Sequence, residues 1–319
     1  MVADELRRAG QRFGSARYIS QRFKVSYQTA HRLLVELERD GLIIRRAGSG
    51  SYIAGQKKSL RSAFLIFASR AKRPGSFGDL LLRQLTAKLE SAGLPFEVRL
   101  GSVPRKHIRD DVYPVLWDSP RLMQDLSAHY RFSLVLHDKP PAGIGSLFTD
   151  SISVDDFNGG ITAGQILSRY APRRPAVIGG PQSDLRSQRR IEGFQQIFPF
   201  TQVIAAGTWF SRSAIKSIAG PLGSVGPDGL FCCSDRLAEA TLICYQNWRI
   251  PAPVVIGFDN APVAETLGLS TIGIPWEEVA RAAAGVIKKR LDGRTDHASA
   301  IVLPPVPVMR NSLRWADSR

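Results

Sequence analysis

Cysteine is scarce in this chain, and long apolar runs are missing from it. Three cysteines occur in 319 residues, Cys232, Cys233 and Cys244, and their spacing fits no metal site, so we expect reduced, buried thiols. No run of about 18 apolar residues is present that could span a membrane. The first residues, MVADELRRAGQR, lack the apolar core of a signal peptide. These absences predict a cytoplasmic protein.

Catalytic signatures are missing as well. The sequence has no G-x-x-x-x-G-K-(S/T) phosphate loop, no G-x-S-x-G motif and no H-E-x-x-H motif. The histidines at positions 31, 107, 129, 137 and 297 lack the spacing of metal ligands. Asp155 and Asp156 are adjacent acids, but neighbours along a loop diverge, whereas acid–base catalysis needs groups that converge on one substrate. We therefore expect no enzymatic activity, no metal and no cofactor.

Positive charge is abundant and is concentrated at the N-terminus. The net charge is +15, and residues 1–60 alone contain 12 Lys/Arg against 5 Asp/Glu. This density suits a polyanionic partner such as a nucleic acid, and a solvated basic surface is the alternative. The remaining composition, 44% hydrophobic and 22% charged residues, is that of a globular protein long enough for more than one domain.

Residues 13–53 carry two helical patterns followed by two strand-like segments. Ile19 and Phe23 share one face of a short helix predicted over 17–23. Ser26 is suited to cap a second helix over 27–39. Four apolar residues recur on the inner face of that helix at i, i+3, i+4 and i+7: Ala30, Leu33, Leu34 and Leu37. Residues 42–46 and 51–54 predict two strands joined by a flexible tip.

The outer face of the second helix carries polar residues near its start. Tyr27, Gln28, His31 and Arg32 lie there, in the part of a recognition helix that reaches base edges. The positive end of the helix dipole favours phosphates at the same place. This order of elements predicts a winged helix-turn-helix that inserts one helix into the DNA major groove.

The same segment resembles the GntR-type winged helix-turn-helix. The matching positions are Arg17, Ile19, Val25-Ser26, Thr29, Asp40-Gly41-Leu42 and the wing GSGSYI at 48–53. The resemblance implies DNA contacts through Arg17, through the start of the second helix and through the wing tip. Tyr27 and His31 stand where that family commonly has arginines, so we expect a distinct operator sequence. The predicted DNA-binding residues are Arg17, Ser26, Tyr27, Gln28, Thr29, His31, Arg32, Gly48, Ser49 and Gly50. A small helical cap without DNA contact is the alternative.

The remainder of the chain predicts an α/β architecture. Residues 55–61 are small and polar and predict a linker between a head, residues 1–54, and a larger part, residues 62–319. In the larger part, apolar runs at 63–69, 132–137, 175–180, 229–234 and 253–259 alternate with amphipathic helical patterns. Such alternation predicts doubly wound parallel sheets, which bind ligands beyond the carboxyl ends of their strands.

Five segments carry a second resemblance, to the LacI/GalR effector-binding domain, a relative of periplasmic sugar-binding proteins. They are 153–167, 176–194, 229–242, 250–283 and 310–315, whereas the stretch 70–125 fits the pattern least. The resemblance implies a two-lobed, periplasmic-binding-protein-like domain that binds an effector between its lobes. The predicted effector-binding residues are Arg190, Asp259, Trp276, Trp209, Asp235, Ser69, Phe77 and Asp138.

Ser69, Phe77 and Asp138 are proposed from their positions after strands, whereas each of the other five residues has a role and an alternative to it. Arg190 and Asp259 are expected to hold sugar hydroxyls by charge-assisted hydrogen bonds, and a purely structural salt bridge is the alternative. Trp276 and Trp209 either stack on an apolar sugar face or serve packing alone. Asp235 contacts the effector, caps its own helix or serves the structure of its lobe.

Together the two resemblances predict a ligand-responsive repressor similar to the arabinose-responsive class. The expected partners are a double-stranded DNA operator, a small-molecule effector that is a sugar, and a second copy of the chain in a homodimer. The effector is expected to change the affinity for the operator. Two alternatives remain: a sugar-binding protein with a degenerate head, and an enzyme on a doubly wound fold.

Overall fold

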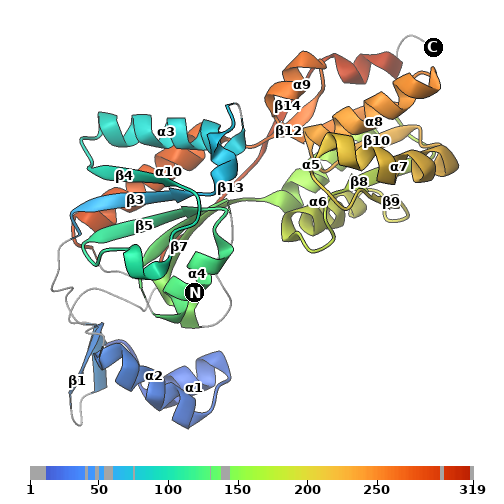
Figure 1. Cartoon of the computed structure of the whole chain (residues 1–319). Helices are drawn as coiled ribbons and strands as arrows, with labels where there is room; N and C mark the ends of the chain where they lie inside the picture. Colours follow the sequence, from blue (N-terminus) through green and yellow to red (C-terminus); the bar gives the residue numbers. More distant parts are fainter. Residues whose placement is uncertain are drawn as a thin grey trace. The chain divides into compact units, whose positions relative to one another are not determined.

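The N-terminal head consists of two helices and a two-stranded hairpin. The computed structural model of the chain describes residues 12–39, 42–46, 50–53, 60–74, 76–129, 131–137, 144–294 and 298–316. Helices α1 (Ala16–Phe23) and α2 (Tyr27–Arg39) precede strands β1 (Ile43–Arg46) and β2 (Gly50–Ile53), which pair antiparallel (Figure 1). Ser15 Oγ accepts a hydrogen bond of 3.1 Å from the Tyr18 N–H, and this bond caps α1. The elements begin and end within two residues of the positions expected from the sequence.

The inner face of α2 forms the core of the head. Ala30, Leu33, Leu34 and Leu37 are all buried, in the periodicity that the sequence indicates. They pack with apolar residues of the segment around α1, Phe13, Ala16 and Ile19, and with Ile43 of β1. Because this core is small, each of its larger side chains contributes a considerable share of the stability of the head.

The chain divides into two compact units, and it passes between them three times. Unit 1 comprises Met1–Ser153 and Trp276–Ile301, and unit 2 comprises Val154–Pro275 and Val302–Arg319. Outside the head, each unit is built on one six-stranded sheet.

The sheet of unit 1 has the strand order β13-β7-β6-β5-β3-β4. Strands β3 to β7 run parallel to their neighbours. The strands are β3 (Ser62–Phe67), β4 (Phe96–Leu100), β5 (Val112–Trp117), β6 (Ser133–Leu136), β7 (Thr149–Val154) and β13 (Ala300–Leu303). Helices α3 (Phe77–Ser91) and α10 (Trp276–Leu291) cover one face, and α4 (Pro120–Ala128) covers the other (Figure 1). Short 3-10 helices occupy η2 (Ser69–Lys72), η3 (Arg105–His107) and η4 (Ile144–Phe148).

The sheet of unit 2 has the order β14-β12-β11-β10-β8-β9, parallel except for the β12–β14 pair. The strands are β8 (Pro175–Gly179), β9 (Gln202–Ala205), β10 (Gly229–Cys232), β11 (Val254–Asp259), β12 (Thr271–Gly273) and β14 (Val306–Val308). The helices are α5 (Asp156–Ser168), α6 (Leu185–Gln195), α7 (Ser211–Val225), α8 (Asp235–Trp248), α9 (Pro262–Thr266) and the 3-10 helix η5 (Asn311–Ala316). Helices α5 and α6 pack together, as do α7 and α8.

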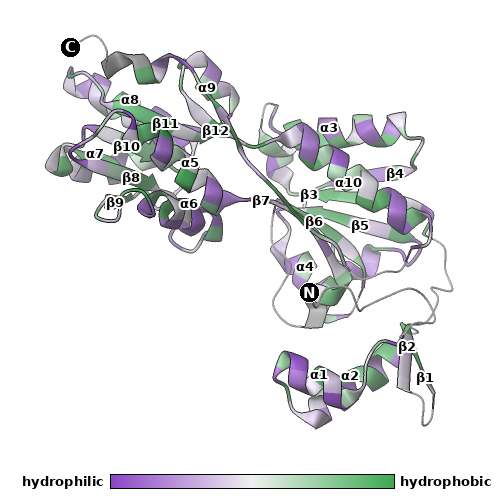
Figure 2. Ribbon diagram, turned by 180° about the vertical axis from the view of Figure 1, so that it is seen from behind, coloured by the Kyte–Doolittle hydropathy of each residue, from purple (hydrophilic) through white to green (hydrophobic). Residues whose placement is uncertain are grey.

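The expected α/β fold with parallel sheets is confirmed. The five apolar runs form β3, β6, β8, β10 and β11, and apolar residues predominate along inner strands such as β8, β10 and β11 (Figure 2). The central strand β5 was not among the expected runs. All six of its residues, VYPVLW, are buried, and it lies between β3 and β6. Its proline and its short apolar run conceal it in the sequence, because proline is unusual inside a central strand.

Helices α5 and α6 approach each other closely through two glycines. A Cβ atom on Gly160 would collide with the carbonyl oxygen of Arg190, and one on Gly193 would collide with the carbonyl oxygen of Phe157. The close packing brings the first turn of α5 against the middle of α6.

Within the described residues, no helix is long and apolar enough to cross a membrane.

Candidate functional site

The outer face of α2 is exposed in the head. Tyr27, Gln28, Thr29, His31 and Arg32 all face solvent, opposite the buried apolar stripe of the same helix. Arg17 of α1 is exposed as well. Gly50 begins β2, whereas Gly48 and Ser49 of the expected wing tip lie outside the described residues.

Several side chains of this surface are fixed by contacts within the head. Ser26 Oγ accepts a hydrogen bond of 3.0 Å from the Thr29 N–H and lies 2.8 Å from Thr29 Oγ1. Ser26 therefore caps α2, as the sequence indicates. His31 Nε2 lies 3.3 Å from an Arg45 guanidinium nitrogen, which links α2 to the hairpin.

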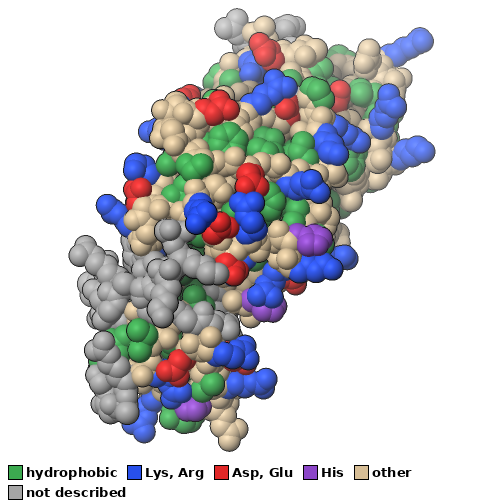
Figure 3. All heavy atoms as spheres, turned by 60° about the vertical axis from the view of Figure 1, so that its left-hand side comes forward, with side chains coloured by type: hydrophobic (Ala, Val, Ile, Leu, Met, Phe, Trp, Pro, Cys, Tyr) green, Lys and Arg blue, Asp and Glu red, His purple; other side chains and the backbone are tan. Residues whose placement is uncertain are grey.

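Basic side chains are not confined to the head. Figure 3 shows Lys and Arg spread over the whole visible face, interspersed with acidic groups. Charge alone therefore does not single out a nucleic-acid surface. The distinguishing feature of the head is the polar, exposed start of α2.

The most elaborate polar cluster of unit 2 surrounds Arg190. Its Nε donates a hydrogen bond of 2.7 Å to Asp156 Oδ1, and its Nη1 donates to Asp259 Oδ1 at 3.1 Å and to the Cys233 carbonyl oxygen at 2.6 Å. The guanidinium also lies 3.6 Å from the centre of the Phe258 ring. Arg190 is only 3% exposed. The cluster joins α5 and α6 to the carboxyl ends of β10 and β11, the edge where parallel sheets bind ligands.

Burial and pairing act on the charges of this cluster in opposite directions. Burial lowers the pKa of the Arg190 guanidinium, but Asp156 and Asp259 outweigh it and keep that pKa above its ordinary value. Burial raises the pKa of Asp259 to about 6, while Arg190 opposes the rise. The cluster thus places one guanidinium between the carboxyl groups of Asp156 and Asp259, whose oxygen lone pairs suit hydroxyl donors.

Left-handed backbone occurs at three strand ends. Asp259 and Asn260, at the end of β11, have φ of 108° and 55°, and in unit 1 Asp118 after β5 and His137 after β6 have φ of 53° and 55°. Non-glycine residues adopt such conformations at an energetic cost, and they are concentrated at functional sites. This strain indicates a functional site at the carboxyl edge of each sheet.

Trp209 belongs to the same edge of unit 2. Its Nε1 donates a hydrogen bond of 3.0 Å to Asp184 Oδ2, and its ring lies so close to Gly180 that a Cβ there would collide with it. Asp184 also pairs with Arg186 at 2.7 Å. Burial tends to raise the pKa of Asp184, but the hydrogen bonds from Arg186 and Trp209 lower it below its usual range. Trp209 is therefore held in a fixed orientation and remains half-buried.

Asp235 differs from the expected effector contact. Its carboxylate is fully buried and accepts hydrogen bonds of 2.6 Å each from the Ala261 N–H and the Thr271 hydroxyl. Burial, reinforced by Asp259, raises its pKa to about 8. Ser234, not Asp235, caps α8. Because both carboxylate oxygens already bond groups of unit 2, this geometry corresponds to a structural role.

An aromatic group lies at the carboxyl edge of the sheet in unit 1. The rings of Phe77 and Trp276 are stacked with centroids 5.6 Å apart, and His137 meets Trp276 edge-on at 5.4 Å. The Trp276 Nε1 atom is buried and has no hydrogen-bond partner among the described residues. A buried donor of this kind is available to a ligand. Ser69 is exposed at the start of η2, and Asp138 lies outside the described residues.

The structure adds residues that the sequence patterns did not single out. Asp156 contacts Arg190, and in unit 1 Arg70 pairs with Asp118 at 2.5 Å and lies over the Trp117 ring at 4.6 Å. The adjacent acids Asp155 and Asp156 are not expected from the sequence to act on one substrate, because neighbouring side chains diverge. They do diverge, since Asp155 caps α5 through the Asn158 N–H. That divergence is what turns Asp156 toward Arg190.

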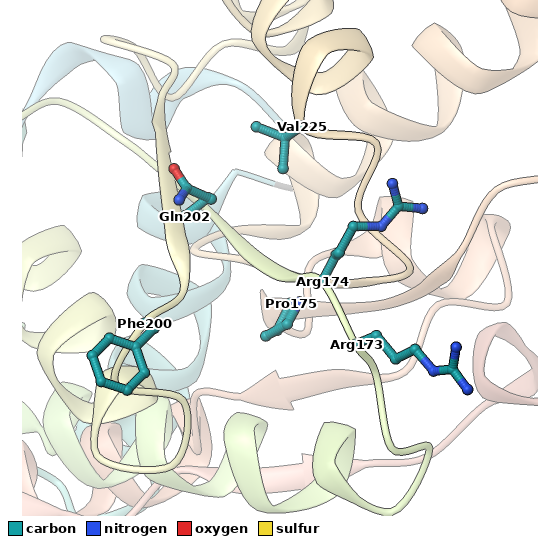
Figure 4. A pocket seen from close by; sticks show the side chains of 6 residues that line it. All are labelled: Arg173, Arg174, Pro175, Phe200, Gln202 and Val225. Carbon is teal, nitrogen blue, oxygen red and sulfur yellow. The ribbon is translucent and has the colours of Figure 1, made fainter.

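A hollow of about 350 Å³ lies elsewhere on unit 2. It is lined by residues at the opposite, amino-terminal edge of the sheet: Arg173, Arg174, Pro175, Phe200, Gln202 and Val225 (Figure 4). None of the predicted effector residues lines it.

Among the described residues, no group of His, Cys, Asp and Glu is arranged to hold a metal ion.

Comparison with known proteins shows which proteins the larger part of the chain resembles. A family model for the periplasmic binding protein-like domain matches residues 172–313. The HTH-type transcriptional repressor PurR of Proteus mirabilis is 26% identical over 178 residues, which cover 52% of each chain. The regulator CelR of Thermobifida fusca is 25% identical over 189 residues, or 54% of each chain. The chain thus spans about half the length of the curated relatives it matches.

Solved structures with a similar fold cover a larger share of this chain. A LacI-family regulator from Enterococcus faecium with bound ribose is 19% identical, covers 78% of this chain and 97% of its own, and has a TM-score of 0.64. The CelR–cellobiose complex is 17% identical, covers 94% of this chain and 99% of its own, and has a TM-score of 0.67. The larger part of this chain therefore has the fold of the LacI-family effector domain.

Proposed function

We propose that this protein is a transcriptional repressor whose affinity for a DNA operator is changed by a small sugar. The head, residues 1–54, binds DNA, and the periplasmic-binding-protein-like part binds the effector without turning it over. The proposal requires a cytoplasmic location, where operator DNA is found. Two observations on one chain support the proposal. The start of α2 is polar and exposed and lies beside a hairpin, and the larger part of the chain has the fold of a LacI-family effector domain.

The head is proposed to be a winged helix-turn-helix of the GntR type. Its two helices and hairpin have the required order, and the exposed residues Arg17, Tyr27 and Gln28 lie on surfaces that can meet phosphates and base edges. A GntR-type head joined to a LacI/GalR-type sensor resembles the arabinose-responsive repressors. We propose a homodimer that binds a pseudo-palindromic operator, because paired heads match paired half-sites.

The effector is proposed to contact the Arg190 cluster of unit 2. Asp156 and Asp259 offer lone pairs to hydroxyl donors, and the half-buried ring of Trp209 offers an apolar face. Polyhydroxylated ligands need this combination of directional hydrogen bonds and a flat apolar surface. Two of the solved structures with this fold hold ribose and cellobiose, which supports a sugar as the effector class. In unit 1, Phe77 and Trp276 are proposed to contribute a further aromatic surface.

A two-step experiment tests this function. A thermal-shift screen of the full chain against pentoses, hexoses and uronates identifies the effector, and a gel shift on duplexes from upstream of its own gene detects the operator. We expect retention of a specific duplex over random-sequence DNA and a change of affinity with one sugar. For the switch to operate, the coupling free energy has to reach about 1–3 kcal/mol.

Arg17→Ala provides the matched variant in the head. Removal of one phosphate contact should weaken binding to all duplexes and reduce the slope of log K against log salt by about 0.9. Lys216→Ala, at an exposed position of α7 in unit 2, should leave both quantities unchanged. Failure of the unaltered protein to prefer any duplex would exclude the proposed function.

A further inference from the structure

The exposed start of α2 contains one side chain that differs from its neighbours. The hydroxyls of Ser26 and Thr29 lie 2.8 Å apart, and Arg32 pairs with Glu36 at 3.2 Å. His31 contacts Arg45, and the Tyr27 ring lies beside the His31 ring with centroids 6.3 Å apart.

Gln28 has no such contact. Among the described residues, no hydrogen bond, ion pair or ring contact involves its side chain, although it is exposed between two residues that are engaged. Its position, second in α2, lies in the part of a recognition helix that reaches base edges. The Gln28 carboxamide is therefore free to turn toward a base without the loss of an existing contact.

The chemistry of the side chain determines which base it can recognise. A carboxamide presents one acceptor and two donors, which match N6 and N7 of adenine in the major groove. Guanine is recognised instead by the paired donors of arginine. No arginine occurs from Ser26 to His31, and Arg32, in the second turn, pairs with Glu36. The first turn of α2 is thus equipped for adenine and lacks the usual reader of guanine.

We propose that Gln28 reads an adenine in each half-site of the operator by a bidentate hydrogen bond. This assignment rests on the proposed function of the head as a DNA-binding module. It makes Gln28 a determinant of sequence preference, whereas Arg17 contributes affinity that does not depend on sequence.

The test selects operators from a random duplex library with the full chain and then measures affinity for each single base-pair replacement. The unaltered protein should select half-sites with an A·T pair whose replacement by G·C weakens binding roughly 10- to 100-fold. Gln28→Ala should lose the preference at this one pair and keep the others. Gln28→Arg should shift the preference at the same pair to guanine.

Two measurements separate base reading from a general effect on the head. Gln28→Ala should keep the salt slope of the unaltered protein, because no phosphate contact is removed. Gln21→Ala, an exposed glutamine on α1, should leave the base preference at every position unchanged. Circular dichroism melting of each variant checks that the head remains folded.

The outcomes are distinguishable from failure of the proposed function. If the unaltered protein selects no sequence, DNA recognition itself is wrong. If it selects an operator but Gln28→Ala retains the full preference at every base pair, DNA recognition stands and the role of Gln28 is overturned. A preference for G·C at the pair that responds to Gln28→Ala would likewise exclude adenine reading.

Discussion

The Nη1 atom of Arg190 donates a hydrogen bond of 3.1 Å to Oδ1 of Asp259, and both side chains are almost completely buried. The two residues are 69 positions apart in the sequence. Asp259 is held there in a left-handed backbone conformation. A buried charge pair contributes little net stability compared with apolar packing, yet the loss of one partner is costly. The effector contact proposed above gives this pair a role that its small net contribution to stability does not.

Replacement of Arg190 should separate the two proposed functions of the chain, DNA binding and the response to effector. Arg190→Ala removes the guanidinium that hydrogen-bonds both Asp156 and Asp259, which should lower the free energy of unfolding of unit 2 by about 3–5 kcal/mol. DNA binding should be retained and the response to effector lost. Arg189→Ala, at an exposed neighbour that pairs with Glu192, should change stability by less than about 1 kcal/mol. A normal response in Arg190→Ala would show that the effector binds elsewhere.

The buried carboxyl of Asp235 should make stability depend on pH. In the unfolded chain an aspartate titrates near a pKa of about 3.9. In the folded chain burial raises the pKa of Asp235 to about 8. Between these values the folded state binds the extra proton, so the free energy of unfolding should fall as pH rises from about 4 to 8, by up to roughly 1.4 kcal/mol per pH unit.

The variant Asp235→Asn isolates this contribution, because a carboxamide stays neutral at every pH. Urea unfolding at several pH values between 5 and 8 should give a flatter dependence for Asp235→Asn than for the unaltered protein. Asp292→Asn, at an exposed carboxylate in unit 1, should leave the slope unchanged. Parallel curves for all three proteins would contradict the assignment to Asp235.

The close approach of α5 and α6 should not tolerate a side chain at Gly193. In Gly193→Ala the new methyl meets the carbonyl oxygen of Phe157, so the helices must separate, at a cost of at least about 1–3 kcal/mol. Because Asp156 lies on α5 and Arg190 on α6, effector affinity should fall as well. Gly223→Ala in α7 meets no atom within 4 Å and should stabilise the protein by about 0.5–1 kcal/mol. Chemical denaturation and effector titration measure both effects, and a neutral Gly193→Ala would refute the packing argument.

The small core of the head should make DNA binding sensitive to a single buried leucine. Leu37 of α2 is fully buried, and Leu37→Ala should cost about 2–5 kcal/mol. This loss should unfold the head and abolish operator binding while the effector still binds. Val35→Ala, on the exposed side of the same helix, should retain DNA binding. Operator affinity and effector affinity measured on the same preparations decide the outcome, and loss of both in Leu37→Ala would argue against independent folding of the head.

Local sequence patterns predicted the helices and hairpin of the head and five strands of the two sheets. The heptad-like spacing of Ala30, Leu33 and Leu37 determines the buried face of α2, because the period of a helix is a property of neighbouring residues. Strand β5 escaped this reasoning because Pro114 interrupts its short apolar run. Candidate residues after strands could likewise be proposed from the alternation of elements alone.

The partners of those candidate residues were decided only by the tertiary structure. The sequence determined that Arg190 and Asp259 are polar residues beside apolar elements, and that the start of α2 is polar on its outer face. It did not determine that Asp156 would pair with Arg190 or that Asp235 would bond Ala261 and Thr271. These contacts join segments 26 to 36 residues apart, and they form only when helices and strands pack into one unit. Burial, which sets the charge states of Asp235 and Asp259, arises from the same packing and has no local signature in the sequence.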